Sequence, residues 1–396
     1  MELIAEKYKQ TDIGVIPTDW DIDFVKNIAE IKTGGKNTQD RIEGGEYPFF
    51  VRSQIVERIN SYSYDGEAVL TAGDGVGVGK VMHYINGKFD CHQRVYRISD
   101  FNNKISGYYF YLYFSNNFLN RIMQMTAKSS VDSVRMDVIA NMQIPIPPTI
   151  IEQTAIATAL SDADALINSL EKLIAKKRNI KQGAMQQLLK PKDGWEVKKL
   201  PDLVWFQEGP GVRNSQFTSS GVKLLNGTNI EDGKLILEKT DRYISENEAF
   251  GWYSHFLVDN GDILIACSGV TIDKFEEKVT VANSTHLPLC MNTSTMRFKI
   301  ISNALSKRYF FHFLKSKSFK QQIGGKATGS AQLNFGPSHV KMVEISLPTF
   351  EEQDNIATIL SDMDAEISAL ESKLEKYRKV KLGMMQNLLT GKIRLI

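Results

Sequence analysis

Apolar residues recur at alternating intervals of four and three in two long segments of the chain, residues 149–190 and 349–396. This period of 3.5 residues is typical of a coiled-coil seam, and neither segment contains a proline. Each segment opens with Thr-x-x-Glu, which places a hydroxyl at the N-cap of a helix and a carboxylate three residues later. We therefore predict two long helices, with the seam residues Ile156, Leu160, Ile167, Leu170, Ile174, Ile356, Leu360, Met363, Ile367, Leu370 and Leu374.

The two helical segments are copies of one another. Residues 152–189 and 352–389, which are related by a shift of 200 positions, are identical at 21 of 38 positions. A fainter match extends upstream and includes Tyr109-Phe110 with Tyr309-Phe310. Still further upstream Trp20 pairs best with Trp195, a shift of 175, so the second copy carries about 25 additional residues. The chain therefore reads as globule, helix, globule, helix.

Both globules are predicted to be mixed α+β domains, at residues 1–148 and 191–348. Short runs of β-branched and aromatic residues between glycine turns predict the strands. They lie at 47–51, 68–70, 81–84 and 95–98 in the first globule and at 222–225, 262–266, 295–300 and 343–347 in the second. One aromatic-rich helix is expected in each globule, at about 106–126 and 306–323. The predicted fold class is α+β, with two tandem domains that are each followed by a long helix.

Composition narrows the class of protein. The length of 396 residues predicts two or three domains, and 42% hydrophobic and 24% charged residues are ordinary for a globular protein. Neither a run of about 18 apolar residues nor a signal-peptide core is found in the sequence. Three cysteines without a Cys-x-x-Cys pair predict neither a disulfide framework nor a structural zinc site. We therefore expect a cytoplasmic protein without a membrane partner.

The sequence predicts no catalytic residue and no metal site in this chain. The glycine-rich run 73–80 fails as a phosphate-binding P-loop, because Asp74 and Val81 stand where a glycine and a hydroxyl residue are needed. We interpret this run as a tight turn, with approach of its backbone to a DNA phosphate as the alternative. The six histidines carry no ligand spacing, and Pro147-Pro148 lacks the flanking residues of a methyltransferase motif.

Local charge indicates a polyanionic partner, although the net charge of the chain is only +2. Residues 278–343 contain ten Lys or Arg residues and no acidic residue, and residues 101–131 are also free of acids. A one-sided basic surface is typical of proteins that contact phosphates. The alternative is a solvated helix face, and for the interleaved aromatic residues a place in the core is the favoured interpretation.

Over essentially its whole length, the chain resembles the specificity subunits of type I restriction–modification enzymes. The most specific part is the duplicated helix, EQTAIATALSDADALINSLEKL and EQDNIATILSDMDAEISALESKL. The segments IGVIPTDW, PKDGW, AGDGVGVGKV and GPGVRN are similar to those of the family as well. The resemblance implies two target-recognition domains that each read one half of a split DNA sequence. It also implies that the two helices pack as an antiparallel coiled coil and set the gap between the half-sites.

The resemblance implies further that this chain is not itself an enzyme. Its partners would be double-stranded DNA, two adenine-N6 methyltransferase subunits and two translocating restriction subunits. S-adenosylmethionine, ATP and Mg would then be bound by the partner subunits. The repeated helices would offer two docking surfaces near Glu171, Lys176, Arg178, Glu371, Lys376 and Arg378. Intramolecular ion pairs are an equally good interpretation of these charges.

Side chains that read base edges are expected to be Arg, Lys, Asn and Gln on loops and strand ends. The candidates are Lys36, Asn37, Arg52, Gln54, Lys80, Gln93, Arg94, Lys128, Arg135, Arg213, Asn214, Asn229, Lys274, Lys317, Lys320, Lys326 and Gln332. Divergence of the two globules implies an asymmetric target. Two other interpretations stay open, a self-sufficient DNA methyltransferase or nuclease and a coiled-coil adaptor that reads no DNA. The missing cofactor motifs argue against the first, and the acid-free stretches argue against the second.

Overall fold

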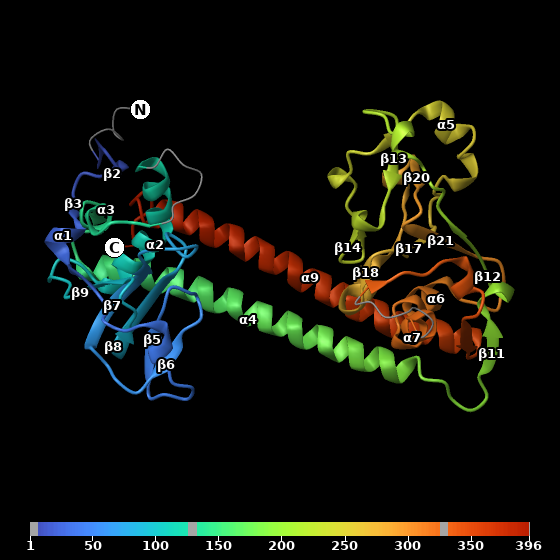
Figure 1. Ribbon diagram of the computed structural model, residues 1–396, viewed down its shortest axis with the longest axis horizontal. Helices are drawn as coiled ribbons and strands as arrows, with labels where there is room; N and C mark the ends of the chain where they lie inside the picture. Colours follow the sequence, from blue (N-terminus) through green and yellow to red (C-terminus); the bar gives the residue numbers. More distant parts are fainter. Residues whose placement is uncertain (1–6, 126–132, 325–331, 396) are drawn as a thin grey trace. The chain divides into compact units, whose positions relative to one another are not determined.

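The computed structural model describes residues 7–125, 133–324 and 332–395 of the chain (Figure 1). The chain folds into two compact units. Unit 1 comprises residues 1–172 and 372–396, and unit 2 comprises residues 173–371. Each unit thus contains one globule, the first half of the long helix that follows it and the second half of the other long helix. This grouping differs from a linear division of the sequence into four segments.

Unit 1 is built on a six-stranded sheet with the strand order β4-β9-β7-β8-β5-β6 (Figure 1). The strands are β4 (Glu30–Thr33), β5 (Tyr47–Phe50), β6 (Glu57–Ile59), β7 (Tyr64–Ala72), β8 (Met82–Cys91) and β9 (Val95–Ser99). Neighbouring strands are antiparallel except β5 and β8, which pair in parallel at Phe49 with Asp90 and at Phe50 with Cys91. The strands predicted in this globule are confirmed, and β7 and β8 extend well beyond their predicted bounds.

The remaining elements of unit 1 complete the globule. Two short antiparallel pairs are formed by β1 (Tyr8–Thr11) with β2 (Gly14–Pro17) and by β3 (Asp21–Phe24) with β10 (Gln143–Ile146). The helices of the globule are α1 (Val25–Ile28), α2 (Gly107–Met125) and α3 (Met136–Ala140). Helix α2 lies against β7 and β8. Its buried Phe110, Phe114 and Phe118 share one core with Val69 and Ile98 of the sheet, as expected for the aromatic residues.

Unit 2 distributes the corresponding strands over two sheets, β12-β21-β17-β19 and β16-β13-β20. The strands are β12 (Val204–Glu208), β13 (Val222–Leu225), β16 (Tyr243–Ile244), β17 (Ile263–Ala266), β19 (Val279–Val281), β20 (Leu289–Met291) and β21 (Thr295–Ile300). Three further pairs are β11 (Glu196–Lys199) with β23 (Glu344–Leu347), β14 (Ile230–Glu231) with β15 (Lys234–Leu235), and β18 (Val270–Thr271) with β22 (Gln332–Leu333). The strands predicted in this globule are confirmed as well.

Strand order and pairing show that the two units share one fold. The order β12-β21-β17-β19 repeats the order β4-β9-β7-β8. Strand β13 pairs in parallel with β20, as β5 pairs with the end of β8. The long strand β8 therefore corresponds to the two strands β19 and β20. The connection from β13 to β17 is longer than the one from β5 to β7, and it contains β14, β15 and α5 (Glu246–Phe250).

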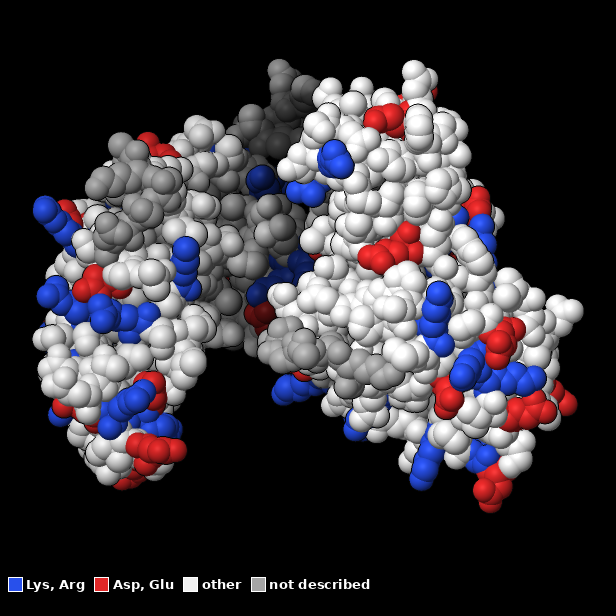
Figure 2. Space-filling view, turned by 45° about the vertical axis from the view of Figure 1, so that its right-hand side comes forward, with Lys and Arg blue, Asp and Glu red and all other residues white. Residues whose placement is uncertain are grey.

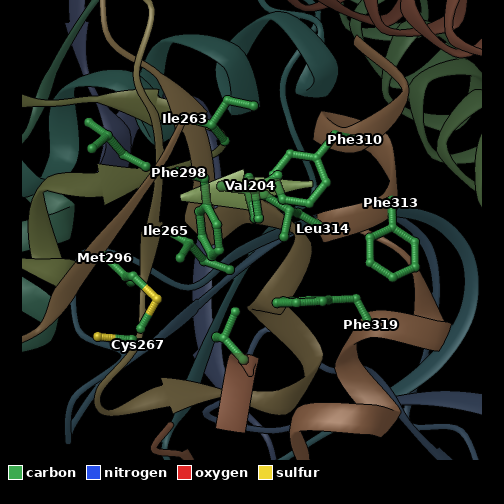
Figure 3. Close-up of a cluster of buried hydrophobic side chains, with 14 of the residues drawn as sticks. Val204, Ile263, Ile265, Cys267, Met296, Phe298, Phe310, Phe313, Leu314 and Phe319 are labelled. Carbon is green, nitrogen blue, oxygen red and sulfur yellow. The ribbon is translucent and has the colours of Figure 1, made fainter. Parts of the chain in front are cut away.

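The aromatic segment of unit 2 forms two helices, α6 (Lys307–Leu314) and α7 (Lys317–Gly324), so the single helix predicted at 306–323 is wrong. The break lies at Ser316, whose hydroxyl accepts the Phe319 N–H at 3.2 Å and caps the first turn of α7. Figure 3 shows Phe310, Phe313 and Phe319 gathered with Phe298 of the sheet in one buried cluster. These aromatic residues therefore belong to the core. The short helix α8 (Pro337–Val340) follows before β23.

The long helices are α4 (Ile150–Leu188) and α9 (Phe350–Leu388). In α4 the Thr149 hydroxyl accepts the Glu152 N–H at 3.1 Å, and the equivalent bond of α9 measures 3.3 Å. The hydroxyl half of each predicted capping box is thus confirmed. The glutamates of the two boxes differ from the prediction. Each of them binds a cation that follows the C-terminal end of the other long helix. Arg394 donates to Glu152 at 2.8 Å, and Lys192 donates to the equivalent glutamate of α9 at 2.9 Å.

Within each unit, half of α4 packs antiparallel to half of α9. Four cross-helix ion pairs with N···O distances of 2.5–2.6 Å mark the register. They join Asp164 with Lys381 and Glu171 with Arg378 in unit 1, and Lys181 with Asp364 and Arg178 with Glu371 in unit 2. Each pair of unit 2 joins the residues that correspond, by the shift of 200 positions, to the two residues of a pair in unit 1. Four of the six residues expected near a docking surface thus form intramolecular ion pairs.

The seam between the helices continues into the core of each globule. Nine of the predicted seam residues are buried, and Met363 and Leu370 are half-buried. Ile156 of α4 shares the core of unit 1 with Leu388 of α9, and Ile356 of α9 shares the core of unit 2 with Met185 of α4. The globule and its two helix halves therefore form one folded body in each unit.

A buried glutamine ties each long helix to its own globule. Gln153 accepts the Ser106 N–H at 2.8 Å and donates to the carbonyls of Lys104 at 2.8 Å and Pro147 at 3.1 Å. Gln353 makes the equivalent three bonds in unit 2 at 2.8, 2.9 and 3.1 Å. Both side chains are at most 1% exposed. In the part of the chain that the structure describes, no helix is long and apolar enough to cross a membrane.

Candidate nucleic-acid interface

Four loops of unit 1 meet at one end of the six-stranded sheet. They follow β4, β5 and β7 and precede β9, and the segment before α3 joins them. Their backbone hydrogen bonds run from Gly34 to Val95, from His92 to Phe50, from Gly73 to Arg94 and from Val134 to Gly73, with N···O distances of 2.8–3.3 Å. Residues far apart in the sequence are thereby fixed side by side on one exposed edge.

Asp74 lies at the centre of these loops between two arginines. Its carboxylate is 2.8 Å from the Arg52 Nη1 and 3.7 Å from the Arg94 Nε. The side chains of Arg52 and Arg94 are 46% and 65% exposed, whereas that of Asp74 is 26% exposed. The carboxylate thus lies beneath two guanidinium groups that face the solvent.

Amide side chains flank this trio. Gln93 donates to the Asn37 side chain at 2.6 Å, and the Gln93 N–H donates to the Lys36 carbonyl at 2.9 Å. The His92 ring is nearly buried, and its Nδ1 accepts the Arg94 N–H at 3.0 Å. Burial, and next the charge of Arg52, lower the pKa of His92 below its ordinary value, which favours the neutral ring that can keep this acceptor.

Unit 2 builds the same edge with the same backbone bonds. They run from Gly209 to Thr295, from Asn292 to Leu225, from Cys267 to Ser294 and from Phe335 to Cys267, with N···O distances of 2.9–3.0 Å. Each bond has its counterpart in unit 1, so positions in the two units can be matched one to one. Arg52, Asp74 and Arg94 correspond in this way to Gly227, Ser268 and Ser294.

The matched edge of unit 2 is hollow and uncharged where unit 1 carries its arginines. Gly227, Ser268 and Ser294 line a cleft of about 450 Å³. Asn292 and Asn226 also line it, and the Asn292 amide donates to the Asn226 side chain at 3.0 Å. One cation and one anion, Arg242 and Asp241, stand next to each other in the lining as well. The cleft therefore offers amide and hydroxyl groups, which can donate to and accept from base edges.

The glycine-rich run of unit 1 is a turn that supports this edge. Residues 73–80 connect β7 to β8, and Gly75 and Gly79 have φ angles of +75° and +69°. A Cβ at Gly77 would lie 2.6 Å from the Arg52 carbonyl oxygen. The interpretation as a tight turn is therefore confirmed, and its glycines let the turn pass directly under the loop that carries Arg52.

Comparison with known proteins places this architecture in a family. The family model for the type I restriction modification DNA specificity domain matches residues 17–182 and again residues 192–377. The chain belongs to this family. The type I restriction enzyme MjaVIII specificity subunit of Methanocaldococcus jannaschii is 27% identical over 430 residues, which cover 100% of this chain and 99% of that protein. The EcoDI specificity subunit of Escherichia coli is 30% identical over 169 residues, which cover 43% of this chain and 36% of that protein.

Solved structures agree on the fold of these specificity domains. The type I restriction–modification S subunit from M. genitalium superposes with a TM-score of 0.59 at 15% identity. The alignment covers 97% of this chain and 98% of that one. The two specificity domains found by the family model lie in two units of one topology, as the repeat in the sequence predicts.

Only some of the other candidates from the sequence lie at the loop-built edge of either unit, which we call the specificity edge. In unit 1, Gln54, Lys80 and Arg135 are exposed on the loops that meet there. In unit 2, Arg213 and Asn214 are exposed on the loop that follows β12. Lys128 and Lys326 lie outside the described residues.

Some candidates of unit 2 have structural roles or lie elsewhere. Asn229 stands in the cleft lining but is 3% exposed, and its side chain accepts the Asn226 N–H at 2.9 Å, so it shapes the loop there. Gln332 belongs to β22, and Lys274 is exposed between β18 and β19. The two lysines of α7 lie outside the cleft lining. Lys317 is exposed, and the Lys320 amine donates to the Ile272 carbonyl at 2.7 Å.

The charge pattern of the specificity domains is mixed on the face that Figure 2 shows. Lys and Arg side chains lie among Asp and Glu side chains there. Part of the basic stretch is also turned inward: Lys315 is close to Lys181, Asp364 and Glu276, and burial lowers its pKa to about 8. Arg297 of this stretch is also buried, 3.2 Å from Asp262, and the Lys278 amine donates to the Ile230 carbonyl, so the acid-free stretch does not form one exposed basic surface.

Groups that could carry other chemistry are sparse among residues 7–125, 133–324 and 332–395. These residues contain no cluster of three or more His, Cys, Asp or Glu side chains arranged to hold a metal ion. The three cysteines are buried and unpaired, and burial raises each thiol pKa to about 12. The candidates for DNA binding that were predicted from the sequence did not include Asp74, Asn226, Asn292, Ser268 or Ser294. The repeat could have indicated Ser294, because the shift of 200 positions matches it with the candidate Arg94.

Proposed function

We propose that this chain reads a bipartite, asymmetric DNA sequence and directs adenine-N6 methylation and restriction by partner subunits. Unit 1 reads one half of the target and unit 2 reads the other. The observation that carries the proposal is the matched edge of the two specificity domains. Identical backbone bonds present two arginines and an aspartate in unit 1, but a cleft lined by amides and hydroxyls in unit 2. Equivalent positions with different chemistry give two half-sites of different sequence.

The partners in this proposal are two methyltransferase subunits and two translocating restriction subunits. S-adenosylmethionine, ATP and Mg²⁺ are bound by those partners, and this chain contributes the sequence specificity and no catalytic group. Isothermal titration of the purified full chain with S-adenosylmethionine should then give no binding heat. Tight binding would overturn the assignment of the cofactor to the partners.

The decisive experiment is a map of methylated adenines by single-molecule sequencing. Host DNA is compared with and without this chain, in cells where the methyltransferase partner is shown to be active. A split, asymmetric motif that disappears with the chain is the expected result. An unchanged methylation pattern would contradict the proposal and favour a coiled-coil adaptor.

A binding assay tests the contribution of phosphate contacts. Charge reversal at Lys317 and Lys320 should weaken binding of the assembled complex to every duplex alike, and it should reduce the salt slope by about one per lost contact. The matched control reverses Lys199 of β11, which is also exposed in unit 2 and is not among the DNA-binding candidates. Unchanged affinity and salt slope in the double variant would remove the first turn of α7 from the DNA interface.

A further inference from the structure

The Arg52–Asp74–Arg94 trio is built as a unit rather than as two separate surface cations. We propose that it is the guanine-reading element of unit 1, and this inference rests on the proposed function. Arg52 follows β5, Asp74 follows β7 and Arg94 precedes β9, so three separate loops each supply one side chain. The backbone bonds between those loops fix where each side chain begins.

The geometry leaves the donors of both arginines available to a ligand. Asp74 contacts one nitrogen of each guanidinium group, at 2.8 Å for Arg52 and 3.7 Å for Arg94. A guanidinium group carries five N–H donors in a planar fork, and guanine presents O6 and N7 as two adjacent acceptors in the major groove. A guanidinium held at one nitrogen keeps a free edge for that pair of acceptors. The carboxylate also restricts the rotation of both side chains, which lowers the entropy lost when a base is bound.

Asp74 also decides between a base and a phosphate as the ligand. The trio carries a net charge of +1 instead of +2. A phosphate oxygen on the Arg52 guanidinium would stand close to the Asp74 carboxylate and be repelled by it. The acceptors of guanine carry only partial negative charges, so this repulsion is much smaller for them. The carboxylate orients both arginines, and by repelling an anion it favours a base edge over a phosphate as their ligand.

The comparison between the units shows that the trio is not required by the fold. Gly227, Ser268 and Ser294 occupy the matched positions of unit 2, where the same backbone bonds form without any charged group. The edge therefore folds equally well with glycine and serine at these places. What the trio adds is a set of exposed donors, which is a difference in what the edge can bind.

The test measures which base pair loses its recognition when an arginine is removed. The variants Arg52→Gln and Arg94→Gln are assembled with the methyltransferase partner, and their methylated adenines are mapped. The control Arg41→Gln removes an exposed arginine of the same unit that also pairs with a carboxylate, Glu57 at 3.2 Å. We expect each variant of the trio to relax the motif at a G·C pair in one half-site only. The control should leave the motif unchanged.

Binding to modified duplexes identifies the atom that is read. The wild-type complex should bind about 10- to 100-fold more weakly when 7-deazaguanine, which lacks the N7 acceptor, replaces the guanine in question. The arginine variant that reads this base should lose that preference. Arg52→Lys keeps the charge but lacks the planar fork, so it should restore non-specific binding and leave the guanine preference lost.

The outcomes separate this inference from the proposed function. A wild-type chain that directs no split motif defeats the proposed function itself. A specific wild-type complex whose trio variants keep the same motif, or weaken binding to all sequences equally, defeats only the guanine assignment. Relaxation at an A·T pair would also defeat it. Unfolding midpoints of the variants that match the wild type exclude misfolding as the cause of any loss.

Discussion

The glutamine that ties each long helix to its globule should be among the most sensitive positions of the chain. Replacing Gln153 by Met keeps the side-chain length but removes one acceptor and two donated hydrogen bonds. The Ser106 N–H and the carbonyls of Lys104 and Pro147 would lose their partners. The contact with Pro147 is buried and the other two are partly buried. At about 1–3 kcal/mol for each buried polar group left unpaired, we expect a loss of roughly 2–4 kcal/mol in the stability of unit 1.

The assay must resolve the two units, because a chain of this kind need not unfold in one step. Hydrogen exchange followed by mass spectrometry, at increasing urea, gives a free energy of opening for peptides of each unit separately. The loss should be confined to unit 1, and Gln353→Met should produce the mirror result in unit 2. Gln182→Met changes an exposed residue of α4 and is the control. A loss below about 0.5 kcal/mol in both glutamine variants would refute the reasoning.

Two further predictions concern pH and a close backbone contact. His312 is 1% exposed and burial lowers its pKa to about 4, so the folded unit binds fewer protons than the unfolded chain between pH 6.5 and 4. The free energy of unfolding should therefore decrease by about 2 kcal/mol as the pH is lowered from 7 to 5. Urea unfolding of the His312→Gln variant should not show this decrease. Gly77→Ala would place a Cβ 2.6 Å from the Arg52 carbonyl and should weaken DNA binding about tenfold in a gel shift, at the scale of one lost base contact. Gly183→Ala in α4, with no atom within 4 Å of its Cβ, is the control, and equal affinities for both variants would contradict the expectation.

The sequence predicted the parts of the fold that depend on local pattern. Heptad spacing and the capping threonines place both long helices to within a residue or two of their observed starts. Short alternating runs locate the strands. The split between α6 and α7 was missed because it depends on one capping hydroxyl, that of Ser316, inside an otherwise helical pattern.

The arrangement of the specificity edge could not be predicted in the same way. Arg52, Asp74 and Arg94 come from three loops, and only the parallel pairing of β5 with β8 and the antiparallel pairing of β7 with β9 bring them together. Spacing along the chain carries no information about such non-local pairings. Amides and hydroxyls such as those of Asn292 and Ser294 are common in loops, so their types alone do not indicate a cleft.

The pairing between the long helices has a consequence for how genes of this kind could change. Asp164 with Lys381 in unit 1 and Lys181 with Asp364 in unit 2 are the same pair, set 200 positions apart. The first half of each helix therefore carries the acids of these pairs and the second half carries the bases, so the first half of either helix matches the second half of the other. A genetic crossover within the codons of these helices would join segments whose charges remain complementary. Recombination could exchange one globule for another and still yield a chain whose helices find their register, so new specificities could arise without the invention of a new interface.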